Sequence, residues 1–91
     1  MDQDILKEVM SALEQVSDLI YQGNIEQANR LLVVTLQALE QTIMQIEDEN
    51  GQADMKEKLL EALEAMENED HILLADILRY EVYESLKKYI I

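Results

Sequence analysis

The sequence predicts an all-α protein: an up-and-down four-helix bundle, built from two helical hairpins, that forms a single domain over residues 1–91. Three observations predict this fold. The 91 residues include no proline and only two glycines, so little in the chain interrupts a helix. Apolar side chains make up 48% of the chain and recur every three or four positions along four segments. Both glycines, Gly23 and Gly51, follow the end of such a segment.

The first hairpin is predicted from residues 4–21 and 25–47. Gly23 ends the first helix, and Asn24 with Gln27 has the spacing of a capping box that starts the second. The apolar stripe of the first helix consists of Ile5, Val9, Ala12, Leu13, Val16, Leu19 and Ile20. The second helix carries a wider stripe, with Ile25, Ala28, Leu31, Leu32, Val33, Val34, Leu36, Leu39, Ile43 and Ile46. That width indicates the centre of the bundle, a subunit contact, or both, so a homodimer is expected.

The second hairpin is predicted from residues 55–67 and 71–89. Asn50 and Gly51 are expected to end the second helix, and Asp54 with Glu57 forms a second capping box. Asp70 caps the last helix. The inward positions of this helix are Leu74, Ala75, Leu78, Val82, Leu86 and Tyr89, while Leu73, Ile77 and Tyr80 form a second apolar edge. That edge needs a cover from a neighbouring helix or from another molecule.

The chain is strongly acidic, with 20 acidic and seven basic residues and a formal charge of −13. This charge repels phosphate backbones and anionic lipids, so neither nucleic acid nor a membrane is an expected partner. A basic protein surface or a divalent cation would be attracted. The start of the sequence lacks the positive region of a secretory signal, and no apolar run is long enough to span a bilayer, so we expect a cytoplasmic protein.

One segment resembles a metal-binding loop. Within residues 46–57, Asp48, Asn50, Asp54 and Glu57 occupy the third, fifth, ninth and twelfth positions of an EF-hand calcium loop, although Ile46 stands at the first position. The same residues also fit a helix end followed by a capping box. A protein that responds to divalent cations is therefore the alternative function.

Two groups of residues suggest a surface that binds a protein partner. Glu57, Glu61 and Glu64 lie along one face of the third helix, which predicts either a docking strip for a basic segment or a solvated face. On the last helix, Asp76, Arg79, Tyr80 and Tyr83 combine residue types that are enriched in binding hot spots. The alternative is that the tyrosines pack at the rim of the bundle and that Asp76 pairs with Arg79 or Tyr80, one turn on.

The sequence shows no set of residues for catalysis. The chain has no cysteine, one histidine, His71, and three serines, so a nucleophile with a matching base is not apparent. We therefore expect a protein that is not an enzyme and needs no cofactor.

The segment from Leu73 to Glu81, LLADILRYE, resembles a signature near the end of small, acidic, uncharacterised helical proteins from Gram-positive bacteria. The resemblance covers about ten residues and implies a cytoplasmic bundle of unassigned function. Together these observations favour a small non-enzymatic adaptor, regulator or chaperone that binds a basic protein.

Overall fold

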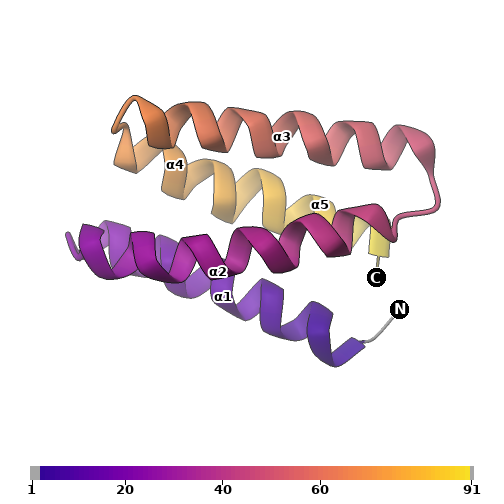
Figure 1. Cartoon of the computed structure of the whole chain (residues 1–91), viewed down its shortest axis with the longest axis horizontal. Coiled ribbons are helices and arrows are strands. Elements are labelled where there is room, and N and C mark those ends of the chain that lie inside the picture. Colours follow the sequence, from indigo (N-terminus) through magenta and orange to yellow (C-terminus); the bar gives the residue numbers. More distant parts are fainter. Residues whose placement is uncertain (1–2, 91) are drawn as a thin grey trace.

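The computed structural model describes residues 3–90, which form four antiparallel helical rods and no strand (Figure 1). The first three rods are α1 (Gln3–Tyr21), α2 (Ile25–Met44) and α3 (Glu49–Glu67). The last rod is continuous and comprises α4 (His71–Asp76), the π-helical segment η1 (Ile77–Val82) and α5 (Tyr83–Ile90). The predicted all-α, up-and-down bundle of two helical hairpins is therefore confirmed.

The four rods are not equally close to one another. The rod α1 packs against both α2 and the last rod, and α3 packs against the other side of the last rod. In contrast, α2 and α3 make few contacts. Figure 1 shows the α1/α2 hairpin in the lower half of the view, and α3 and α4 in the upper half. Each pair of neighbouring rods meets along a seam, and these seams differ in their chemistry.

The core is aliphatic, as the composition predicts. The most deeply buried large side chains, which come from all four rods, are Leu6, Leu13, Val16, Leu32, Leu39, Ile43, Met55, Leu74, Leu78, Val82 and Leu86. Three positions of the predicted apolar stripes lie outside the core. In α1, Ile5 is 50% exposed while its neighbour Leu6 is 1% exposed. The inward stripe of α1 runs through Leu6, Val9 and Leu13, and Ile5 lies one residue, about 100°, away from it. Val33 and Val34 also lie outside the core.

The turns within the two hairpins use the same backbone device. Gly23 has a φ of +84°, and the N–H of Asn24 donates to the Leu19 carbonyl at 2.8 Å. In the second hairpin Glu69 adopts a φ of +56°, and the N–H of Asp70 donates to the Ala65 carbonyl at 2.9 Å. Each turn thus satisfies the last carbonyls of a helix through a left-handed residue.

The residues that precede α2 and α4 behave differently. The Asp70 carboxylate accepts a hydrogen bond from the Leu73 N–H at 3.3 Å, which confirms the predicted cap. The Asn24 side chain makes no capping hydrogen bond, so the predicted capping box at the start of α2 is not formed.

The connection between α2 and α3 differs from the prediction. The helix α2 ends at Met44 and not at residue 47, and α3 begins at Glu49 and not at residue 55. Asp48 is the cap of α3, because its Oδ1 accepts the N–H of Asn50 at 3.0 Å. Asn50 and Gly51 therefore belong to the first turn of α3 and do not end α2.

Packing explains the glycine at position 51. A Cβ atom on Gly51 would lie 2.7 Å from Cδ1 of Tyr89, so the aromatic ring of the last rod occupies the space that any other side chain would need. Two polar side chains, Gln52 and Asp54, also hold the first turns of α3. The Gln52 side chain donates to the carbonyls of Ile43 and Met44, at 3.3 Å each, at the end of α2. Asp54 accepts hydrogen bonds from Lys58 at 3.0 Å and from Tyr89 at 3.1 Å.

Because α3 begins at Glu49, Asp54 lies inside the helix and does not cap it. The predicted capping box of Asp54 and Glu57 is therefore wrong. The bond to Lys58, together with the Tyr89 hydroxyl, lowers the pKa of Asp54. Asp54 therefore ties α3 to the last rod at the same end of the bundle as Gly51.

Candidate partner-binding surfaces

Most of the residues predicted for partner binding are divided between two seams, while Glu57 is exposed on α3 and lines neither. Asp76, Arg79 and Tyr83 lie along the seam between α1 and the last rod, which we call the polar seam. Glu61 and Glu64 lie along the seam between α3 and the last rod. Sequence periodicity placed both sets on exposed faces, but it could not show which neighbouring rod each set adjoins.

The polar seam is closed by contacts within the chain. The Tyr21 hydroxyl donates to the Asp76 carboxylate at 2.5 Å, and Arg79 pairs with Asp18 at 3.6 Å. Asp76 therefore bonds across the seam to Tyr21. The sequence suggested instead that Asp76 pairs with Arg79 or Tyr80, and that local pairing is not formed. The hydrogen bond to Asp76 raises the pKa of Tyr21 to about 12.

Further along the polar seam, hydrogen bonding to the Glu14 carboxylate raises the pKa of Tyr83. Lys87 also lies over the Tyr83 ring, 5.7 Å from its centroid. The polar side chains of this seam thus hold α1 against the last rod. Tyr80 differs from the other predicted hot-spot residues, because it is 65% exposed.

The seam between α3 and the last rod forms a hollow of about 230 Å³, which we call the acidic groove. Its lining residues are Glu61, Glu64, Ala65, Asn68, Asp70, Leu73, Ile77 and Glu81. Glu61 and Glu64 stand on the α3 side, and Glu81 on η1 stands opposite them. Ala65, Leu73 and Ile77 add apolar surface between these acids.

Three glutamates of the acidic groove form no ion pair with the described part of the chain. Within residues 3–90, Glu61, Glu64 and Glu81 form no ion pair, whereas Lys58 and Lys87 are paired with Asp54 and Glu84. Several like charges therefore face one groove without internal compensation. Such an arrangement attracts a cation from outside the chain.

An exposed apolar side chain borders this groove. Leu73 is 46% exposed, and Ile77 lies buried one turn further along the same rod. Sequence analysis identified Leu73, Ile77 and Tyr80 as an apolar edge, and it identified the acidic ridge separately. It missed Glu81 as the opposite wall of the groove. Its place four residues after Ile77 was the available signal.

The predicted calcium-binding loop is not formed. Residues 49–57 are helical, so Asn50, Asp54 and Glu57 cannot curl around an ion as an EF-hand loop does. Asp48 caps the helix, and Asp54 bonds to Lys58 and Tyr89. In the described part of the chain, no three His, Cys, Asp or Glu side chains gather closely enough to hold a metal ion. The alternative function thus loses the loop geometry on which it depended.

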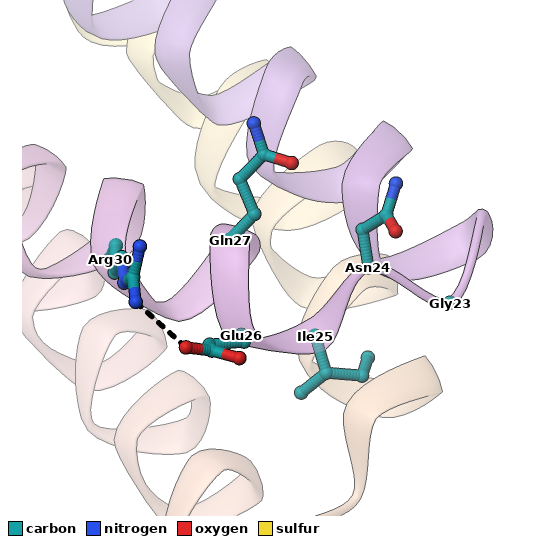
Figure 2. A pocket seen from close by; sticks show the side chains of 6 residues that line it. All are labelled: Gly23, Asn24, Ile25, Glu26, Gln27 and Arg30. Carbon is teal, nitrogen blue, oxygen red and sulfur yellow. Dashed lines mark hydrogen bonds and ion pairs between the residues drawn. The ribbon is translucent and has the colours of Figure 1, made fainter.

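Another hollow, of about 510 Å³, lies beside the turn from α1 to α2 and includes Gly23 and the first residues of α2. Figure 2 shows its polar side chains: Asn24 and Gln27 point to one side of the first turn, and Glu26 pairs with Arg30 at 2.7 Å. Both members of this ion pair are strongly exposed. The hollow therefore offers a satisfied surface pair and no group poised for chemistry.

Two further hollows lie on the seams of α2. The one between α2 and α3 measures about 280 Å³ and is lined by Glu40, Ile43, Met44, Lys56 and Leu59, so it carries both signs of charge. The one between α1 and α2 measures about 160 Å³ and is mostly apolar. We call the α1/α2 seam the neutral seam.

Comparison with known proteins adds a family but no activity. No curated protein and no solved structure is significantly similar to the chain. Within residues 3–90, no helix combines the length and the apolar character that crossing a bilayer requires. A family model described as a domain of unknown function, DUF8042, matches residues 3–90. Because this match spans nearly the whole chain, the protein belongs to the DUF8042 family.

Proposed function

We propose that this protein is a small non-enzymatic binding module that captures a basic, amphipathic segment of another protein in the acidic groove. The observation that carries the proposal is the groove itself, where Glu61, Glu64 and Glu81 surround apolar surface and make no ion pair within the described residues. An adaptor, regulator or chaperone would all use such a surface. We place this binding in the cytoplasm, since a chain without cysteine suits a reducing compartment.

The composition of the groove specifies the chemistry of the partner. A lysine or arginine side chain has a long apolar stem and a charged end. The stem would pack on Leu73 and Ile77, and the charged end would reach the carboxylates of Glu61 or Glu81. Charge-assisted hydrogen bonds of this kind are stronger than neutral ones.

The acidic ridge of α3 sets the size of the segment. It runs from Glu57, outside the groove, to Glu64, which lines it, and covers two helical turns, about 10 Å. A helical partner segment with basic residues three or four positions apart would present two of them to this ridge. Its apolar residues would then cover Leu73, which the chain leaves 46% exposed.

The test uses a synthetic helical peptide with lysines on one face and leucines on the other, labelled for fluorescence anisotropy. The same peptide with all lysines acetylated is the matched ligand control, because it keeps the shape and loses the charge. We expect binding only by the unmodified peptide. The affinity should fall as ionic strength rises from about 0.05 M to about 0.5 M, because salt screens the attraction.

Matched variants separate the groove from the overall charge. The double variant Glu61→Gln/Glu64→Gln should lose about tenfold in affinity, since two partly desolvated ion pairs contribute roughly 1.4 kcal/mol together. The control double variant Glu40→Gln/Glu47→Gln changes the net charge equally but lies outside the groove, so it should change affinity less than about twofold. Equal losses in both variants, or equal binding of the acetylated peptide, would refute the proposed function.

A further inference from the structure

We propose that two copies of the chain associate through the neutral seam, so that the α1/α2 hairpins face each other. The hollow in this seam is lined by Ile5, Glu8, Val9, Ala12, Leu31, Val34, Thr35 and Ala38. The dimer is independent of the proposed function and concerns a different surface.

The shape of the neutral seam suits contact with an identical surface. Ile5 and Val34 are 50% and 64% exposed and line the two sides of the hollow, on α1 and α2. Ala12 and Ala38 have small side chains, which leave the space between the rods unfilled. Branched side chains beside a hollow are self-complementary, because a two-fold axis places those of each copy into the hollow of the other.

Charge identifies a second copy as the occupant. Each copy carries a charge of −13, so two copies repel each other wherever carboxylates are dense. Residues 27–39 of α2 contain no acidic residue, and Glu8 is the one carboxylate that lines the hollow of the neutral seam. The acidic groove, in contrast, is lined by four carboxylates. A basic partner would gain little at the neutral seam, whereas an identical acidic chain meets the least repulsion there.

The available area is sufficient for a dimer. Helices of this length extend about 30 Å, and two adjacent helices present a face about 20 Å wide. Contact over that face would bury roughly 600 Å² on each copy, or about 1,200 Å² in total, which is at the lower end of the range for specific interfaces.

The dimer also bears on partner binding, and this consequence rests on the proposed function. The neutral seam belongs to the α1/α2 hairpin, and the acidic groove lies on the other hairpin (Figure 1). A dimer formed through α1 and α2 therefore leaves both acidic grooves accessible. A partner with two basic segments would bind both, and its second contact would benefit from a raised effective concentration.

The test compares two neighbouring residues by sedimentation equilibrium. Val34→Glu introduces a charge into the neutral seam and should weaken the dimer by about tenfold or more. Val33→Glu introduces the same charge at an equally exposed position one residue, about 100°, away on α2, and should leave the dimer nearly intact. Higher salt should strengthen the dimer, because it screens the repulsion between two acidic chains. This dependence is opposite to the one expected for the basic peptide.

A second variant tests the charge argument. Glu8→Gln removes a carboxylate from each side of the interface and should tighten the dimer. Circular dichroism of each variant verifies the fold, which exposed substitutions preserve. Three results would overturn the proposal: a monomer at chain concentrations up to about 1 mM at high salt, equal effects of Val33→Glu and Val34→Glu, or a dimer that Glu8→Gln leaves unchanged or weakens. None of them would affect peptide binding by the monomer, so the two proposals fail separately.

Discussion

Replacing Gly51 by alanine tests the tightest contact in the bundle. The substitution has two opposing effects on the free energy of unfolding. Alanine favours a helix interior over glycine by up to about 1 kcal/mol, and by less in a first turn such as this one. Its Cβ atom, however, would lie 2.7 Å from Cδ1, 2.9 Å from Cε1 and 3.1 Å from Cγ of Tyr89.

The clash should outweigh the gain in helix propensity. Cγ lies next to the backbone, so the ring cannot avoid the new methyl group by moving only its far end. The Tyr89 hydroxyl is also held by Asp54 at 3.1 Å. Overpacking of this kind typically costs 1–3 kcal/mol, which leaves a net loss of about 1–2 kcal/mol for Gly51→Ala. For a chain of this size we expect the melting temperature to fall by about 5–15 °C.

A double-mutant cycle measured by urea denaturation isolates the contact. In a Tyr89→Ala background the obstructing ring is absent, so the same Gly51→Ala substitution should stabilise the protein by about 0.5–1 kcal/mol. The sign of the effect thus reverses between the two backgrounds. If Gly51→Ala stabilises the protein equally in both, the ring does not occupy this space and the reasoning is wrong.

Three further predictions concern the polar seam and the turns. Because the folded chain holds the Tyr21 proton more tightly (pKa about 12) than the unfolded chain does (10.0), this contribution to stability is complete below pH 10 and is lost between pH 10 and 12. Tyr21→Phe should remove this alkaline loss of unfolding free energy, which amounts to about 1 kcal/mol after allowance for solvent screening. If urea denaturation gives the same dependence of stability on pH in the variant, the prediction is wrong. Asp70→Ala should lower the free energy of unfolding by about 1 kcal/mol, because it removes a capping hydrogen bond. The Asn24 side chain makes no such bond, so Asn24→Ala should cost less than about half of that. Comparable losses in chemical denaturation of the two variants would disprove the distinction. Glu69→Gly should raise the melting temperature by roughly 4–8 °C, because glycine adopts the φ of +56° found at Glu69 without the cost of about 1 kcal/mol that a side chain incurs. A melting temperature below that of the unmodified protein, measured by calorimetry, would exclude this explanation.

The sequence predicted the fold well where local signals and tertiary packing agree. Gly23 follows a helix and adopts the positive φ that its position predicts, and Asp70 caps the last rod. The inward stripe of that rod, from Leu74 to Leu86, is buried as expected. In these segments the hydrophobic period and the capping residues indicate the same boundaries.

The connection from α2 to α3 was mispredicted because a distant contact determines it. An asparagine followed by a glycine is a common turn signal, but here Gly51 is required by the ring of Tyr89, 38 residues further along the chain. Nothing in the local sequence identifies that ring. The same limit applies to the candidate site. The acidic ridge on α3 was predictable, and the spacing of Glu81 from Ile77 places both on one side of the last rod, but nothing local shows that Glu81 lies opposite that ridge. The pairing of α3 with η1 brings the two together.

The π-helical segment explains how one rod serves two different seams. In η1 the helix widens, and the Tyr83 N–H donates to the Leu78 carbonyl five residues earlier. Asp76 and Arg79, on one side, reach Tyr21 and Asp18 of α1. On the other side the same rod presents residues to the acidic groove.

Single turns of π-helix occur frequently at functional sites. Here Glu81 belongs to η1 and lines the groove, and Tyr80, also in η1, is the most exposed aromatic residue of the described chain. Arg79 in the same turn pairs with Asp18 of α1 at 3.6 Å, so η1 both contacts α1 and carries one wall of the acidic groove. The irregular turn therefore supports the acidic groove, rather than the larger hollow beside Gly23, as the binding surface.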